Sequence, residues 1–243
     1  MEAALSLGLL VEAVGQLAGW VAMHKLSFEQ RPVAASAGRV EVHSTASSGG
    51  PVDLEVEITS FRHGAISYRG IATVSGEPVL SLERAVGPLL PMAEFDDAAR
   101  MKDILGQLRR RGLPARPLVS AEDYRPEIRI EDHTDASLSA VLEVPEASAI
   151  YVDHFPRRPL YPATLLLDSQ ILEIQSRFLR PDGTRRAVRE VRAVKVRSFS
   201  GPGETLHFDA NREERGESGP LWFRAETHKD DARVSSMRVA LEA

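Results

Sequence analysis

The residues with the clearest chemical potential lie between Tyr151 and Ile174, where a histidine precedes three regularly spaced prolines and an apolar run. A proline fixes its own φ, lacks a backbone donor and moves the preceding residue away from helical geometry, so residues 154–161 are predicted to form an extended, rigid loop. A helix is expected to follow, with Pro162 in its first turn. His154 would then sit on a rigid support, and an imidazole that titrates near neutral pH can act as a base.

Asp168 lies inside that predicted helix, among leucines. A carboxylate there loses hydration unless it finds a partner, and a desolvated acid keeps its proton closer to neutral pH, as a general acid requires. A structural acid bonded to a neighbouring donor is the more ordinary role for such a residue. We therefore expect Asp168 to be structural rather than catalytic.

A second apolar stretch, from Leu5 to Met23, is hydrophobic almost all round and predicts a buried helix. Glu12 and Gln16 are four residues apart and share one face of it. The stretch imitates a signal peptide or membrane anchor, but it lacks leading basic residues and carries a charge at mid-span, where charges are costly in lipid. We therefore expect burial in protein and no membrane association.

Alternating strands follow each of these helices, and related positions recur at a nearly constant separation. The separations are 156 residues for Glu12 and Asp168, 155 for Tyr68 and Phe223, and 155 for Val79 and Val234. This repeat predicts a tandem duplication. An amphipathic helix over residues 95–111 and a stretch rich in glycine and proline over 112–126 place the boundary, giving units 1–117 and 118–243, with opening strands over 128–144.

The DHFP motif at residues 153–156, the proline spacing after it and the helix with an inward carboxylate resemble the 3-hydroxyacyl-[acyl-carrier-protein] dehydratases of hot-dog fold. Their pattern reads approximately HFPGxPxxPG, an apolar turn, then Glu or Asp; Arg157 and Ala163 replace the two glycines. The segment LLVEAVGQ around Glu12 also fits the central helix of that family. The resemblance implies an α+β double hot-dog: two units, each a long central helix wrapped by a curved antiparallel sheet, with the first unit lacking its opening strand and loop.

In that family the active site is shared across a dimer, with histidine from one unit's loop and the carboxylate from the other unit's helix. The resemblance therefore pairs His154 with Glu12 as catalytic residues and implies one complete and one degenerate site per chain, formed within an internal pseudo-dimer. It places Gln16 and Asp168 in supporting positions. Further candidates are Phe155, Pro156, Tyr161 and Gly8 for binding the substrate, and Arg157 and Arg158 for docking a carrier protein. The amides that receive the thioester oxygen could belong to the histidine loop or to the helix around Gly8, and apolar core is the ordinary alternative for Phe155 and Tyr161.

Composition narrows the function further. A net charge of −5 and a pI near 5.9 argue against nucleic-acid binding. The absence of cysteine excludes disulfides and thiolate chemistry and suits the cytoplasm. The remaining histidines lack ligand spacing, and phosphate-loop and dinucleotide motifs are absent, so we expect neither a metal nor a cofactor.

The resemblance implies dehydration of 3-hydroxyacyl thioesters to trans-2-enoyl thioesters, with an acyl carrier protein or coenzyme A as the carrier. Two alternatives remain open. One is a hot-dog acyl thioesterase, in which a helix carboxylate activates water. The other is a non-catalytic acyl-binding or assembly partner, which the replacements at Arg157 and Ala163 would suit. Further homo-oligomerisation is left open.

Overall fold

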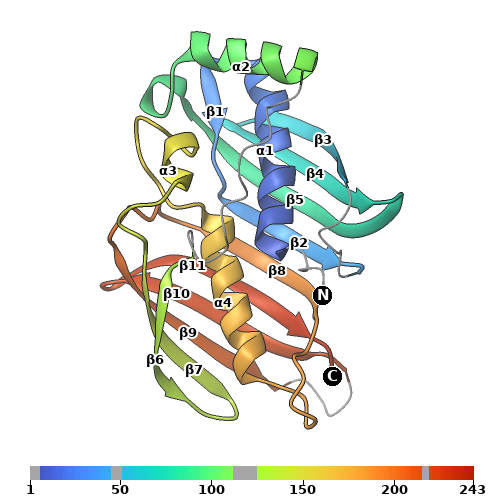
Figure 1. The fold of residues 1–243 in the computed structure, drawn as a ribbon, viewed down its shortest axis with the longest axis vertical. Coiled ribbons are helices and arrows are strands. Elements are labelled where there is room, and N and C mark those ends of the chain that lie inside the picture. Colours follow the sequence, from blue (N-terminus) through green and yellow to red (C-terminus); the bar gives the residue numbers. More distant parts are fainter. Residues whose placement is uncertain (1–5, 45–50, 112–124, 215–218) are drawn as a thin grey trace.

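The computed structural model describes residues 6–44, 51–111, 125–214 and 219–243, and two long helices lie over one face of a single 11-stranded antiparallel sheet (Figure 1). Helix α1 (Leu7–Lys25) covers the first half of the sheet, and α4 (Ala163–Arg177) covers the second. The N-terminal parts of the two helices meet near the middle of the molecule, where Gly8 and Asp168 are in contact. This meeting point lies between the two halves of the sheet.

The first half of the sheet has the strand order β3, β4, β5, β2, and β1 extends it by pairing with the end of β5. Its strands are β1 (Gln30–Pro32), β2 (Ser36–Val42), β3 (Val52–Arg62), β4 (Ala65–Val74) and β5 (Glu77–Pro91). In the described part of the chain, the outer edge of β3 has no partner strand. The first half ends with the short 3-10 helix η1 (Met92–Glu94) and the helix α2 (Ala98–Arg111).

The second half repeats the same order, β9, β10, β11, β8, and adds β7 and β6 beyond β9. Its strands are β6 (Glu127–His133), β7 (Ser137–Glu143), β8 (Val188–Val196), β9 (Thr205–Glu213), β10 (Leu221–Lys229) and β11 (Ala232–Leu241). The short helix α3 (Ile150–Asp153) precedes the histidine loop. The positions predicted to correspond fall on matching elements, since Tyr68 lies in β4 and Phe223 in β10.

The two halves join through antiparallel pairing of β2 with β8, in which Arg39 lies opposite Arg192. Two facing cations would repel each other, but the buried carboxylate of Glu190 accepts hydrogen bonds from both guanidinium groups. One hydrophobic core runs through the junction and contains residues of α1, of α4 and of strands from both halves.

The packing of α1 follows from its sequence. Leu10, Val14, Ala18 and Ala22 recur every four residues and are buried against the sheet. Small residues allow a close approach: a Cβ placed on Gly70 in β4 would lie 2.5 Å from Cγ1 of Val14. By length and composition α1 could also cross a membrane, a test that core helices pass too. Here it packs against β3, β1, β4 and α4.

Several predicted boundaries shift. The first helix begins and ends two residues later than predicted, and the helix predicted from residue 95 begins at Ala98. Pro162 is the N-cap of α4 rather than a residue of its first turn. The histidine loop is not simply extended, because Phe155 adopts φ of 63° and the Arg158 amide donates to the Phe155 carbonyl, closing a turn. The predicted boundary at residues 117/118 lies outside the described residues.

Candidate active site

His154 and Glu12 face each other across the junction of the two halves. The imidazole Nε2 lies 4.0 Å from Oε1 of Glu12, and the two side chains are only 15% and 19% exposed. His154 directly follows α3, and Glu12 projects from the second turn of α1. The separation exceeds a hydrogen bond, so both groups are available to a third molecule, and catalytic contacts are often long before substrate binds.

The orientation of the imidazole is fixed by its other nitrogen. Nδ1 of His154 lies 2.9 Å from the carbonyl oxygen of Leu160. A carbonyl can only accept, so Nδ1 carries the hydrogen and Nε2 presents a lone pair toward Glu12. Burial lowers the pKa of His154, the negative charge of Glu12 and the bond to Leu160 oppose this, and the positive charge of Arg31 reinforces it. The group is therefore set to be a neutral base at neutral pH.

Glu12 is held by one residue from each half. Its Oε1 accepts from Nε2 of Gln16 at 3.0 Å, which is the pairing expected for residues one turn apart. Its Oε2 accepts from the hydroxyl of Thr164 at 2.6 Å, across the contact between α1 and α4. These two bonds fix the carboxyl group from both sides and leave its Oε1 directed toward His154.

Asp168, the residue that corresponds to Glu12 in the predicted repeat, has a different environment. It accepts from the Ser6 hydroxyl at 2.5 Å and from the Gly8 amide at 2.9 Å, and it is 6% exposed. Its carboxylate thus satisfies first-turn donors of α1 and complements the positive end of that helix. Gly8, which binds Asp168, and Thr164, which binds Glu12, are also 156 residues apart. The two acids are thus held from equivalent positions, Asp168 by a backbone amide and Glu12 by a hydroxyl group.

Gly8 takes part in the contact between the two helices. Its amide, one of the candidates for receiving a thioester oxygen, is already bonded to Asp168. A Cβ at this position would lie 2.5 Å from the Cβ of Asp168 and 2.8 Å from the carbonyl oxygen of Thr164. The glycine is therefore required for the close contact of the two helices.

The other residues predicted to bind the substrate divide into buried and exposed ones. Phe155 is 6% exposed and packs with Phe95 and Leu160. Tyr161 is 3% exposed, belongs to the main core, and donates its amide to the carbonyl of Ser200 at 2.8 Å. Pro156 is exposed. The burial of Phe155 and Tyr161 matches the apolar-core alternative.

The arginines predicted to dock a carrier protein have partners within the chain. Arg157 pairs with Asp97 at 3.6 Å and Arg158 with Glu94 at 3.5 Å, and both arginines are about half exposed. Docking through these side chains would have to compete with the ion pairs.

Sequence reasoning missed three residues of the site: Thr164, Arg31 and Tyr68. Burial lowers the pKa of Arg31, while Asp96 and Glu12 oppose the shift; its guanidinium carbon lies 4.4 Å from the centre of the Phe155 ring. Burial, with the charge of Glu12, raises the pKa of Tyr68 to about 12, so its hydroxyl stays neutral. An inward position on an alternating strand could have indicated Tyr68, but no local pattern distinguishes Arg31.

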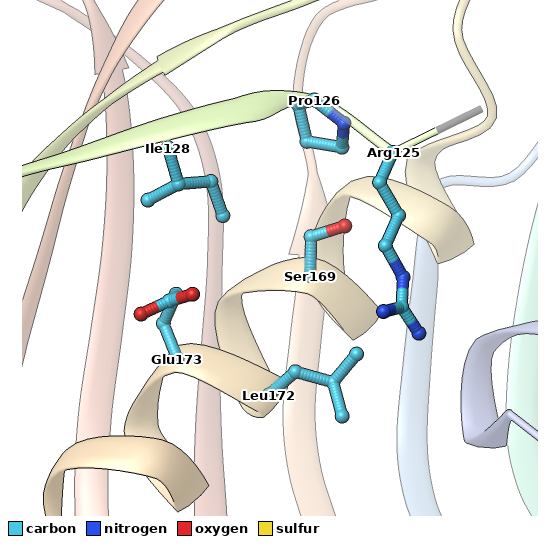
Figure 2. Close-up of a pocket in the computed structure, with 6 residues that line it drawn as sticks. All are labelled: Arg125, Pro126, Ile128, Ser169, Leu172 and Glu173. Carbon is cyan, nitrogen blue, oxygen red and sulfur yellow. The ribbon is translucent and has the colours of Figure 1, made fainter. Parts of the chain in front are cut away.

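Two pockets lie beside the site rather than within it. One of about 170 Å³ is lined by α4 and the start of β6, with Ser169, Leu172 and Glu173 below Arg125, Pro126 and Ile128 (Figure 2). The other, of about 340 Å³, is lined by Phe28, Glu29, Met92, Ala93, Asp96, Asp97, Ala98 and Arg157. Neither His154 nor Glu12 lines either pocket. Within the described ranges, no three His, Asp or Glu side chains are grouped to hold a metal ion.

Comparison with known proteins agrees with this architecture. A sequence model of the ApeI-like family, described as ApeI dehydratase, matches residues 130–238. No curated protein matches the sequence. An acyl-ACP thioesterase structure from Bacteroides thetaiotaomicron is similar with a TM-score of 0.58 at 13% identity, over 98% of this chain and 90% of that one.

Two further solved structures are similar to this chain in fold. A MaoC-like dehydratase has a TM-score of 0.56 at 13% identity, over 95% of this chain and 82% of that one. A protein of unknown function with hot-dog fold, from Alicyclobacillus acidocaldarius, has a TM-score of 0.50 at 12% identity, over 87% and 80%. These likenesses show that the chain has a hot-dog fold.

Proposed function

We propose that this chain is a double hot-dog dehydratase that converts 3-hydroxyacyl thioesters to trans-2-enoyl thioesters. The observation that carries the proposal is the facing pair of His154 and Glu12, one from each half, at 4.0 Å in a largely buried site. The match of residues 130–238 to a dehydratase family and the MaoC-like dehydratase structure support it. The matching strand orders of the two halves support a duplicated origin.

In the proposed reaction, Nε2 of His154 takes a proton from C2, beside the thioester carbonyl. The resulting electron pair forms the C2–C3 double bond as the C3–O bond breaks, and protonated Glu12 delivers its proton to the departing hydroxyl, which leaves as water. The imidazolium then returns its proton to Glu12, directly or through solvent. Each proton transfer contributes roughly 10²–10⁴-fold to the rate.

The developing enolate oxygen needs donors, and the first turn of α4 is the candidate. Ala163 and Thr164 begin this helix, and Pro162 at the N-cap makes no side-chain hydrogen bond to its amides. The amides of Leu165 and Leu166 donate to the Pro162 carbonyl, so the amides of Ala163 and Thr164 are the candidate donors, at a helix end whose dipole favours negative charge. Thr164 also binds Glu12, which brings this helix end beside the proton donor.

The same geometry supports one complete site per chain. The counterpart of Glu12 is Asp168, whose carboxylate is occupied by Ser6 and Gly8 rather than facing a histidine. We propose that the Glu12 site alone turns over substrate, and that the acyl group arrives on an acyl carrier protein. The acyl-ACP thioesterase among the similar structures supports the choice of carrier.

An acyl thioesterase is the second candidate. The hydroxyl of Thr164 and the amide of Gln16 hold Glu12 as they would hold a carboxylate that orients an attacking water. In that reaction Glu12 would take a proton from water as the hydroxide adds to the thioester carbonyl, and would pass it to the departing sulfur, which leaves as the thiol. His154 would not be needed as a base.

Mass spectrometry of carrier-linked 3-hydroxyacyl substrates separates these reactions. The dehydratase gives an enoyl product that is lighter by one water, whereas the thioesterase gives the free acid. His154→Ala and Glu12→Gln should each lower turnover about 10²–10⁴-fold, and His207→Ala, an exposed histidine of β9, should leave turnover unchanged. Free acid as the product, or acyl binding without turnover that is unaffected by His154→Ala, would reject the dehydratase.

The pH dependence tests the role of His154 separately. A base must be neutral, and burial lowers the pKa of this imidazole. The acid limb of kcat/KM should therefore have its midpoint below about 6.5, the ordinary value for histidine. A midpoint clearly above that value would contradict a buried histidine as the base.

A further inference from the structure

The histidine loop is bound by a segment of the first half, residues 92–97, which we call the clamp segment. The amide of Arg157 donates to the carbonyl of Phe95 at 3.1 Å, and its Nη1 donates to the carbonyl of Ala93 at 3.2 Å. Ion pairs from Arg157 to Asp97 and from Arg158 to Glu94 add to these bonds. Backbone, side-chain and charge contacts thus connect the same two segments.

Aromatic packing continues the contact to the imidazole. Phe95 is fully buried, and its ring centre lies 4.9 Å from that of Phe155. The Phe155 ring centre lies 4.0 Å from that of His154, and Arg31 lies over the Phe155 ring. An unbroken chain of contacts therefore runs from the clamp segment through Phe155 to the proposed base.

The loop needs such support. Its three prolines offer no backbone donors, and Phe155 is held at φ of 63°, a left-handed conformation that a bulky side chain adopts only under restraint. Strained backbone of this kind costs about 1–3 kcal/mol and persists when its surroundings determine it. Here the surroundings include Phe95, Arg31 and the imidazole of His154.

The clamp segment is itself anchored to the first half. The amide of Met92 donates to the carbonyl of Glu29, and Met92 packs with Met23 of α1, Phe28 and Met101 of α2. Asp96 is buried and pairs with Arg100 at 2.6 Å. The segment is therefore fixed relative to α1, the helix that carries Glu12.

We propose that the clamp segment holds His154 in register with Glu12 and that Phe95 is the main positioning residue for the dehydration proposed above, on which this inference rests. The two reacting groups come from different halves of the chain. The contact of α1 with α4 joins the two halves, but His154 itself is connected to α4 only through the proline-rich loop. The clamp segment connects the histidine loop directly to the half that carries Glu12.

Phe95→Leu is the test, because it keeps an apolar residue in the site while removing the ring. The probe is ¹⁵N-histidine NMR of the full chain without substrate, with the His154 signals assigned through His154→Gln. We expect the wild-type imidazole to be protonated at Nδ1 with Nε2 free. In Phe95→Leu we expect the other neutral tautomer to appear, as it does for an unrestrained ring.

Turnover should change in the same variant. A displacement of about 1 Å can cost about 10²-fold in rate, so kcat should fall about tenfold or more while KM stays within about threefold. Phe208→Leu is the matched control, because Phe208 is equally buried but lies in β9, within the main core. It should lower the unfolding midpoint and leave the imidazole tautomer and kcat unchanged.

Three outcomes decide the inference. An altered tautomer with reduced kcat in Phe95→Leu alone supports it. Unaltered His154 signals and kcat in Phe95→Leu overturn it, and so do equal changes in Phe208→Leu, which would indicate a general loss of stability. If the wild type fails to dehydrate any 3-hydroxyacyl thioester, the proposed function falls, and the imidazole signals still report whether Phe95 positions His154.

Discussion

Replacing Asp168 by alanine should destabilise the protein strongly. The carboxylate is 6% exposed and accepts from the Gly8 amide at 2.9 Å and from the Ser6 hydroxyl at 2.5 Å. Asp168→Ala removes both acceptors and also a negative charge at the N-terminal end of α1. The change therefore tests whether this acid serves the contact between the two helices.

The expected loss of stability follows from these two bonds. A hydrogen bond to a charged group contributes about 1.5–3 kcal/mol, and the buried Gly8 amide would lose its acceptor outright. Ser6 is only partly buried, so its hydroxyl can donate to water instead and its contribution is smaller. We expect a loss of about 3 kcal/mol in the free energy of unfolding, or about 6–12 °C in Tm for a chain of this length.

Urea unfolding and thermal unfolding of Asp168→Ala would measure this loss, with Asp168→Asn as the matched control. The asparagine keeps one acceptor oxygen for Gly8 and should lose less than half as much. Asp168→Asn should also retain most turnover, whereas Glu12→Gln should not. An unchanged unfolding midpoint in Asp168→Ala would refute the structural role, and equal loss of turnover in Asp168→Asn and Glu12→Gln would refute the single-site arrangement.

Two further variants test the helix contact and the junction of the halves. Gly8→Ala should lower the free energy of unfolding by about 1–3 kcal/mol, because the added methyl group overpacks against Asp168. Gly19→Ala in the same helix should be neutral or stabilising in chemical denaturation, because a Cβ there would have only Cγ of Pro32 nearby, at 3.9 Å. Equal effects of the two changes would contradict the close contact at Gly8. Burial alone would raise the pKa of Glu190, but hydrogen bonds from Arg192 and Arg39 outweigh it and hold that pKa below its usual range. A carboxyl group whose pKa is depressed in the folded state stabilises the protein at pH values above its unfolded-state pKa, and this stabilisation is lost as the pH falls through its folded-state pKa. Glu190→Gln should therefore cost about 1–3 kcal/mol of unfolding free energy at pH 7 and progressively less below about pH 4.5. A difference in unfolding free energy that does not change with pH would argue against the charged bridge.

Much of the fold could be predicted because its signals are local. The every-fourth-residue burial of α1 and the alternation of β3 are visible in the sequence, and α1 lies within two residues of its predicted position. The constant separation of the repeats anticipated the equal strand order of the two halves. Boundaries moved where a cap or turn decides them, as at Pro162 and Ala98.

The site was less accessible to sequence reasoning. The pairing of His154 with Glu12 came from a family resemblance, since no local pattern brings residues 142 positions apart together. Thr164 and Arg31 join the site through packing between the halves, which leaves no mark on spacing. The turn at Phe155 was missed because prolines restrict themselves and their predecessors, whereas its left-handed φ depends on distant aromatic contacts.

The outer edge of β3, which pairs with none of the described strands, bears on how copies of this protein behave at high concentration. An exposed strand edge is a template for another strand, and the inward residues of β3 are apolar. Its exposed face carries Asp53, Glu55 and Glu57 in alternation. If two copies paired edge to edge in antiparallel register about Glu55, Glu55 of one copy would stand opposite Glu55 of the other, and this like-charge repulsion disfavours self-association into extended sheets.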